Sequence, residues 1–454
     1  MSADRLASGA EERLPGLDQM VVNTGQPDTV DSAGEPVVAL GSRYIAAFLL
    51  ASLALYAAWI APAAYSLAIR LEQIDASAKN TALALAIGIP GFAAMLTGPI
   101  FGVLSDRTRS RFGRRRPWFL AGALCGFVGS IAVGLSHSIG AAIFGWTVAY
   151  IGYVGAGGML TAHLGDRLPE NQRGRVGGFS AAVSQVGPVV GVVIAGRFTS
   201  IPVAMLALPA MIGLVGCLFF TIVMKDPLPV SEPGPVDVKA ILEGFWFNPR
   251  THKNYAWVWL SRAFVFLSLS FTSVYTVYLL SERLHLAGGL LANQIATAGI
   301  SGLPVAILGA LASGWLSDKL QRRKPFLVVS AIFVGTGALI TATLSSLPQF
   351  FIGVLVGTLG IGAYGATDQA LVLDVLPREE NQNGRYLAII NLASQFPQAA
   401  GPFLAGFIIK LANGNYTWVY YSAAAFAVVG AALIMPVRYV WREQISSGQD
   451  ARGE

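Results

Sequence analysis

Two ionisable side chains, Arg262 and Asp368, stand inside long apolar stretches of this 454-residue chain and could together handle a proton. Arg262 is the eighth residue of the stretch 255–280. Asp368 lies within the stretch 349–373, six residues before Asp374, which directly follows that stretch. If both stretches are helices, the rise of 1.5 Å per residue places the two side chains about 12 Å and about 9 Å from a polar end. Ionisable groups so deep in a membrane indicate a function. A carboxylate stays ionised beside an arginine and is driven toward protonation when that partner leaves, so the pair is either a proton switch or a static ion pair.

A second group of side chains has the chemistry to bind a sugar, which proteins hold with flat aromatic faces and directional hydrogen bonds. Asn391, Gln395 and Gln398 follow one another at helical spacing and therefore share one face of the stretch 386–410. Amides in lipid are costly unless they meet partners or water, so this face is expected to line an aqueous cavity, although hydrogen bonds between helices would also explain it. The other expected solute contacts are Tyr56, Trp59, Gln185, Tyr275 and Tyr364.

Several other kinds of chemistry lack their residues in this sequence. No Gly-x-x-x-x-Gly-Lys-Ser/Thr loop for nucleotide phosphates occurs, so ATP hydrolysis by this chain is not expected. With four histidines and two cysteines, neither a metal site nor a disulfide framework is expected. No nucleophile–base pair is visible, so the sequence predicts neither an enzyme nor a bound cofactor.

The elements that must position these residues are membrane spans. Hydrophobic residues make up 54% of the chain and charged residues 12%, which is about half of the ~25% found in soluble domains. Tyr44–Ile69 and Thr81–Ser105 contain no charged residue, and each exceeds the roughly 20 residues that cross a bilayer as a helix. The alternating pattern of a β-barrel is missing. The sequence therefore predicts an all-α membrane protein with twelve transmembrane helices, at about 44–69, 79–104, 117–136, 139–164, 176–197, 203–224, 255–280, 288–316, 325–345, 349–373, 386–410 and 416–440.

Basic residues gather in every second connection between these spans. The connection between the second and third spans carries Arg107, Arg114 and Arg115, whereas residues 135–140 contain no lysine or arginine. The positive-inside rule then predicts a multi-pass protein of the inner cell membrane with both chain ends in the cytoplasm. The same rule accounts for the net charge of +6, so nucleic-acid binding is not expected.

The chain also contains an internal repeat. The motif around Asp106, Gly-x-x-x-Asp followed by Arg-Arg-Arg-Pro, recurs around Asp318 as Gly-x-x-x-Asp followed by Arg-Arg-Lys-Pro, and Asp166 recurs as Asp374. The matched residues occur in the same order and are separated by nearly the same number of residues. This implies two six-helix bundles in a parallel pseudo-repeat. A proline-rich stretch between them reads as a linker. The expected division is a disordered cytoplasmic tail (1–40), an N-terminal bundle (41–224), a cytoplasmic linker (225–253), a C-terminal bundle (254–440) and a second cytoplasmic tail (441–454).

The pattern Gly-x-x-x-Asp-Arg … Gly-Arg-Arg-Arg at Gly102–Arg116 resembles the signature loop of the major facilitator superfamily, and the resemblance covers nearly the whole chain. Within that superfamily, Ser105–Pro117 is similar to the loop of the glycoside–pentoside–hexuronide:cation symporters and of the plant sucrose–proton symporters. Sodium-coupled melibiose carriers of this group place acidic residues within the second span. Thr81–Ser105 contains none, so the resemblance favours proton coupling or no coupling over sodium coupling.

The resemblance also implies residue roles. Spans one, four, seven and ten of the superfamily line a central cavity, so Arg262 and Asp368 are expected to face each other. Asp106 is expected to accept hydrogen bonds from the start of the eleventh span, and Asp318 from the fifth, because a helix N-terminus is positive. Arginines of the loops would form ion pairs with carboxylates, and these pairs would hold the outward-open state and separate in the inward-open state. Alternatively, the arginines only fix the orientation of the chain in the membrane. The expected gating set is Asp106, Arg107, Arg114, Arg115, Asp166, Asp318 and Arg322.

Together these features predict a secondary active transporter that works by alternating access. The expected solute is a small polar molecule, a sugar or glycoside, moved together with H⁺ across the lipid bilayer and without an obligate protein partner. Two alternatives stay open at this point. One is an exporter of drugs or metabolites that works as a proton antiporter of the same fold, and the other is a membrane receptor or scaffold that no longer transports.

Overall fold

The computed structural model describes residues 40–224, 226, 247–376 and 383–437. The predicted tails and most of the predicted linker lie outside these residues. Within them every regular element is helical, and the bounds agree with twelve membrane spans. The first half consists of α1 (Ser42–Ala61), the π-helical turn η1 (Pro62–Ser66), α2 (Leu67–Ile74), α3 (Lys79–Arg107), α4 (Arg116–Leu135), α5 (Ile139–Arg167), α6 (Glu170–Arg197) and α7 (Pro202–Val223). The second half consists of α9 (Lys253–Val274), α10 (Thr276–Leu284), α11 (Gly288–Leu320), α12 (Lys324–Ala342), α13 (Leu347–Val375), α14 (Asn383–Leu411) and α15 (Thr417–Leu433).

Length and composition confirm a multi-pass membrane protein. Ten helices of the described chain are long and apolar enough to span a membrane, the first being α1, η1 and α2 taken together as Ser42–Ile74. The shorter apolar helix α15 has 17 residues. The remaining helix, α14, has 29 residues, which is long enough to span a membrane, although amides and prolines interrupt its apolar run. The count of twelve therefore holds.

Each half is held together by glycine contacts in equivalent places. In the first half α4 packs on α5, and a Cβ added at Gly122 would lie 2.6 Å from the carbonyl oxygen of Gly152. In the second half α12 packs on α13, and a Cβ at Gly337 would lie 2.7 Å from the carbonyl oxygen of Gly353. Small residues let membrane helices approach closely enough for dispersion contacts to hold them. The third and fourth spans of each half thus pack in the same way, as the predicted duplication requires.

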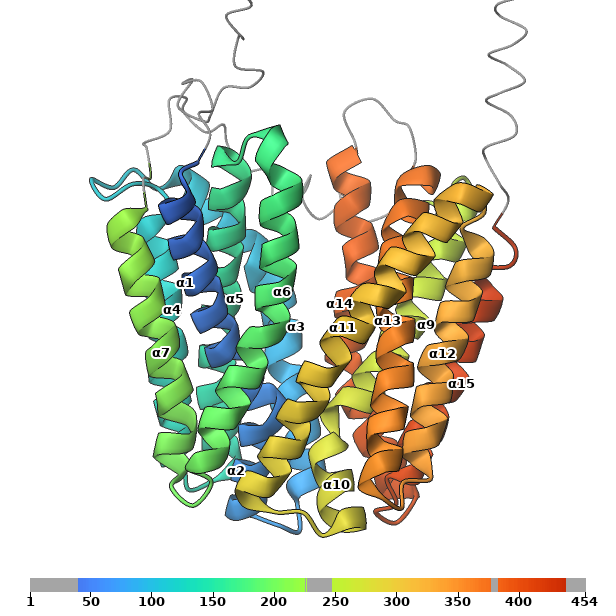
Figure 1. The fold of residues 1–454 in the computed structure, drawn as a ribbon. Coiled ribbons are helices and arrows are strands. Elements are labelled where there is room, and N and C mark those ends of the chain that lie inside the picture. Colours follow the sequence, from blue (N-terminus) through green and yellow to red (C-terminus); the bar gives the residue numbers. More distant parts are fainter. Residues whose placement is uncertain (1–39, 225, 227–246, 377–382, 438–454) are drawn as a thin grey trace, which may run out of the picture.

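The two halves form bundles that stand apart at one end and meet at the other (Figure 1). We call the first the arginine-rich end, because it carries Arg114, Arg115 and Arg323 with their carboxylate partners, and the chain enters and leaves the described structure there. We call the second the tyrosine-rich end, after the four tyrosines that join the halves there: Tyr65, Tyr275, Tyr278 and Tyr416. The polar residues of the predicted site lie on helices that run between these two ends.

Candidate functional site

Arg262 and Asp368 form a buried ion pair between α9 and α13. Nη1 of Arg262 lies 2.7 Å from Oδ2 of Asp368, and the two residues are only 5% and 3% exposed. Tyr364, one helical turn before Asp368 on α13, is buried as well. The guanidinium lies over the ring of Phe266, 5.4 Å from its centroid. The contact predicted from the matching depths is therefore present, and Tyr364 is one of the residues that the sequence singled out as solute contacts.

One atom of this arginine is left without a partner. Nε of Arg262 is buried and, among the residues that the structure describes, donates no hydrogen bond. A buried donor without an acceptor costs about 1–3 kcal/mol, and such cases call for an explanation. The pair therefore holds one unused donor that a ligand or water could satisfy.

Three aromatic rings gather in the first half. Tyr56 and Trp59 of α1 stack with their centroids 6.2 Å apart and their planes 12° apart. Tyr150 of α5 meets Trp59 edge-on at 5.8 Å. Gly187 of α6 permits this arrangement, because a Cβ at that position would lie 2.7 Å from Cβ of Tyr56. The sequence indicated Tyr56 and Trp59 but missed Tyr150, which only the packing of α5 against α1 reveals.

The amide stripe of α14 is exposed. Asn391, Gln395 and Gln398 all have large accessible surfaces, and Nε2 of Gln398 donates to the carbonyl oxygen of Ser394 in its own helix at 3.1 Å. Large apolar residues are exposed on a different side of the same helix, including Phe396 at 49% and Phe407 at 61%. At 100° per residue, Phe396 points about 100° away from Gln395. The helix therefore has two exposed faces, one polar and one apolar.

The other predicted solute contacts divide into exposed and buried residues. Gln185 of α6 is exposed, and Tyr56 and Trp59 are partly exposed. Tyr364 is buried one helical turn before Asp368. Tyr275 is fully buried at the break between α9 and α10, where its hydroxyl donates to the carbonyl oxygen of Asn80 at 3.2 Å. The structure thus places Tyr275 in the contact between the halves and away from any exposed surface.

The arginine-rich end carries matching ion-pair clusters in the two halves. In the first, Nη2 of Arg114 and Nη2 of Arg115 lie 2.5 Å and 2.7 Å from Oδ2 of Asp166. In the second, Arg323 lies 2.7 Å from Asp374 and 2.8 Å from Asp318. In the first half the cluster joins the loop before α4 to the end of α5, and in the second half it joins the loop before α12 to the end of α13. The expected pairing of Arg114 and Arg115 with Asp166 is present.

The other residues of the expected gating set, Asp106, Arg107, Asp318 and Arg322, are exposed in this structure. Arg322 is exposed and is not the paired arginine of the second half, because its neighbour Arg323 occupies that place two residues before the proline, as Arg115 does in the first half. Among the described residues Asp106 contacts Arg114 and Arg115, at 3.7 Å and 3.9 Å, and its side chain is 56% exposed. No contact of Asp106 with α14, or of Asp318 with α6, occurs within the described ranges, because the bundles stand apart at this end. Arg107, the last residue of α3, is also exposed.

Asp226, which follows α7, was not singled out by the sequence. Its Oδ2 accepts hydrogen bonds from the backbone N–H groups of Arg115 and Arg116 at 2.6 Å and 2.8 Å. These N–H groups begin α4, where a carboxylate both caps the free donors and meets the positive end of the helix dipole. Asp226 thus ties the exit of the first bundle to the loop that carries the Asp166 cluster.

Hydrogen bonds between the halves close the tyrosine-rich end. Tyr278 donates to the carbonyl oxygen of Ala68 at 2.9 Å, and Tyr65 donates to that of Gly288 at 2.9 Å. Tyr416 donates to Oδ1 of Asn80 at 2.6 Å. Two of the four tyrosines sit where a span is interrupted, Tyr65 in η1 and Tyr275 between α9 and α10. Irregular backbone therefore accompanies the contacts that join the halves.

Comparisons with known proteins agree with this architecture. The chain is 29% identical over 135 residues to the uncharacterized MFS-type transporter YfiU of Bacillus subtilis (strain 168), a match that covers 29% of this chain and 25% of that protein. It is 28% identical over 129 residues to the putative multidrug resistance protein MdtD of Yersinia pseudotuberculosis serotype I (strain IP32953), covering 28% of this chain and 26% of that protein. The matched region thus spans about a quarter of each of these relatives.

Solved structures share the fold at low sequence identity. A mutant of the nucleoside transporter NupG superposes with a TM-score of 0.72 at 13% identity, covering 87% of this chain and 99% of that one. A D-xylose-proton symporter superposes with a TM-score of 0.64 at 14% identity, covering 87% and 97%. The Major Facilitator Superfamily pattern matches residues 44–312 and 258–453. This chain, with its twelve spans and duplicated loop motif, belongs to the Major Facilitator Superfamily of membrane transporters and is not an enzyme.

Proposed function

We propose that this transporter moves a sugar or glycoside together with protons, and that Asp368 carries the proton. The observation behind this proposal is the buried pair of Arg262 and Asp368 on α9 and α13, which correspond to spans seven and ten. A carboxylate in such a site is kept ionised by the adjacent guanidinium. Protonation of Asp368 would release Arg262, whose unpartnered Nε is already available to a solute oxygen.

The chemistry of the exposed side chains supports an uncharged, hydroxyl-rich solute. Arg262 and Asp368 neutralise each other, so neither is left to select a charged solute. The stacked rings of Tyr56 and Trp59 offer a flat apolar face, as sugar-binding proteins do. The amides of α14 can both donate and accept hydrogen bonds, which suits a hydroxyl group.

The two exposed faces of α14 support a cavity-lining role for its amides. A helix at the edge of a bundle meets acyl chains on one side and the gap between the halves on another. Leu404 and Phe407 suit the acyl chains, whereas unpaired amides there would be costly. On this view the polar face with Asn391 and Gln395 meets water in the gap.

We assign the arginine-rich end to the cytoplasm of an inner-membrane protein. Cations concentrate in its short loops, and the positive-inside rule places such loops inside. Both chain ends then lie in the cytoplasm, and the state with separated bundles at that end is the inward-open one. Asp106 and Asp318, with side chains 56% and 67% exposed, would re-form contacts with the opposite half when the gate closes.

Export of drugs or metabolites is the second candidate. It is favoured by the similarity to the putative multidrug resistance protein MdtD of Yersinia pseudotuberculosis. An exporter would accumulate its substrate in inside-out vesicles in exchange for protons, and its preferred substrates would be apolar. A receptor or scaffold would bind a ligand without any flux.

Transport by purified protein in liposomes tests the proposal. With an acidic exterior, wild-type protein should accumulate a labelled sugar from a panel of mono- and disaccharides, and a protonophore should abolish accumulation. A panel of lipophilic cations under the opposite gradient tests export. Failure to accumulate any sugar, combined with accumulation of lipophilic cations, would reverse the assignment.

A further inference from the structure

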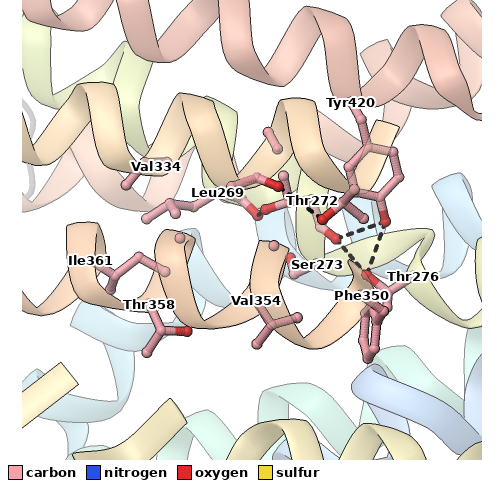
Figure 2. Close-up of a pocket in the computed structure, with 15 residues that line it drawn as sticks. Leu269, Thr272, Ser273, Thr276, Val334, Phe350, Val354, Thr358, Ile361 and Tyr420 are labelled. Carbon is pink, nitrogen blue, oxygen red and sulfur yellow. Dashed lines mark hydrogen bonds between the residues drawn. The ribbon is translucent and has the colours of Figure 1, made fainter. Parts of the chain in front are cut away.

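A pocket of about 160 Å³ lies in the second half between α9, the start of α10, α12, α13 and α15 (Figure 2). We call it the hydroxyl recess, because six of its lining residues carry hydroxyl groups: Thr272, Ser273, Thr276, Thr341, Thr358 and Tyr420. The remaining lining residues are apolar or glycine, and none is charged. Neither the sequence patterns nor the functional assignment above includes this pocket.

The recess begins about two helical turns from the buried ion pair. On α9, the lining residue Leu269 comes seven residues after Arg262, and on α13, the lining residue Ile361 comes seven residues before Asp368. Because these helices run in opposite directions, both counts place the start of the recess on the side of the pair that faces the tyrosine-rich end. Seven residues correspond to about 10 Å along a helix. Ser273 and Ile361 are exposed and form its rim.

The hydroxyl groups of the recess are mostly set to accept hydrogen bonds from a ligand. Thr276 donates to the carbonyl oxygen of Thr272 at 2.6 Å, Thr272 donates to that of Leu269 at 3.0 Å, and Thr341 donates to that of Gly337 at 2.9 Å. Each hydroxyl proton is thereby used within the protein, while oxygen lone pairs remain. Figure 2 shows Thr272, Thr276 and Tyr420 joined in this way at one end of the recess.

Thr358 differs from the other hydroxyls. Within the described part of the chain its hydroxyl makes no hydrogen bond, and Thr358 lines the recess from α13, with its side chain close to Gly302 of α11. It can both donate to and accept from a ligand. The apolar side chains of Phe350 and Val354 lie beside it and suit the C–H face of a ring.

We propose that the hydroxyl recess binds one pyranose ring of a disaccharide or glycoside, and that the ion pair lies beside the other ring. This inference rests on the proposed function, since it names the class of sugar. The volume suits one six-membered ring, because a dry cavity of about 150 Å³ holds benzene, and the exposed rim at Ser273 and Ile361 leaves room for the hydroxyl groups of a pyranose. The lack of charge excludes ionic ligands, and the surplus of acceptors favours a ligand with many O–H donors. A monosaccharide would fill only one of the two places, so disaccharides and aryl glycosides bind more tightly.

Three variants of the full chain test this inference. Val354→Phe fills the recess, and Thr358→Val removes its free hydroxyl without changing the size of the side chain. Thr221→Val is the matched control, because Thr221 on α7 donates to its own helix at 2.7 Å and lies outside the recess. Binding of sucrose, maltose, 4-nitrophenyl glucoside and glucose is measured by calorimetry on purified protein.

The best-bound two-ring ligand should bind wild type and Thr221→Val alike, at least about tenfold more tightly than glucose. Thr358→Val should weaken it by about two- to tenfold, the effect of one hydrogen bond, and Val354→Phe should reduce it to the level of glucose. Unchanged binding by both recess variants would overturn the inference. Sugar uptake by wild type would then leave the proposed function standing. Loss in Val354→Phe with no change in Thr358→Val would indicate an apolar occupant and overturn it as well. A wild type that takes up no sugar would overturn both.

Discussion

Replacing Asp368 with asparagine perturbs the buried ion pair most directly. The change keeps the size of the side chain and removes its charge, so Arg262, which is only 5% exposed, becomes an uncompensated buried cation. Removing one partner of a buried pair costs about 3–5 kcal/mol. Nη1 lies 2.7 Å from the carboxylate, and the asparagine oxygen can still accept a hydrogen bond from it. We therefore expect the free energy of unfolding to fall by about 3 kcal/mol, the lower end of this range.

A double variant separates stability from coupling. Arg262→Gln combined with Asp368→Asn removes both charges, and two neutral amides can hydrogen-bond to each other. Because replacing a whole buried pair is often close to neutral, the double variant should regain most of the stability that the single variant loses. Thermal unfolding in detergent measures both. A double variant no more stable than Asp368→Asn would show that the pair is not energetically coupled.

Transport by the same variants decides the role of the carboxylate. Proton-driven accumulation of sugar should be lost in Asp368→Asn, and the remaining uptake should not vary with pH, because no group is left to bind the proton. Exchange of labelled for unlabelled sugar needs no net proton movement and should persist. Full pH-dependent accumulation by a folded Asp368→Asn protein would refute the reasoning, and the pair would then be only structural.

Three further predictions concern the ends of the bundles. Tyr416→Phe removes a hydrogen bond of 2.6 Å between the halves, worth about 1 kcal/mol, so distances between spin labels at the arginine-rich ends of α5 and α13 should shorten as the population shifts toward the opposite state. Unchanged distance distributions would contradict this. Arg323→Gln should lower the melting temperature and the transport rate, whereas Arg322→Gln should leave both near wild type, because within the described residues Arg323 pairs with carboxylates and Arg322 does not. Equal effects would contradict the assignment. Asp226→Ala should lower the free energy of unfolding by about 1 kcal/mol through loss of the α4 cap, and Asp226→Asn by less, as a denaturant series can show.

The features predictable from the sequence were those that depend on one helix at a time. Span positions follow from runs of apolar residues, and the depths of Arg262 and Asp368 follow from counting at a fixed rise per residue. Both residues lie toward the arginine-rich end of their helices, at similar distances from it. They were therefore expected to be in contact if the two helices lay side by side. The polar face of α14 was visible for the same reason.

Features that depend on loop length, or on contacts between the two halves, were not predictable. The segment from aspartate to proline runs from 106 to 117 in the first half and only from 318 to 325 in the second, so the motif does not show which adjacent arginine faces the carboxylate. Tyr275 follows Thr272 at helical spacing, but the helix breaks at this residue and its ring turns to Asn80 of the other half. Patterns within one helix contain no information about such a partner.

Proton movement driven by sugar tests the central claim most directly. Wild-type protein is reconstituted in liposomes that contain a pH-sensitive dye, with equal pH on both sides and the membrane potential clamped. Adding the transported sugar outside should acidify the interior as protons enter with it, and the Asp368→Asn protein should show no acidification while it still exchanges sugar. Sugar entry into wild-type liposomes without any change of internal pH would contradict proton coupling through this pair.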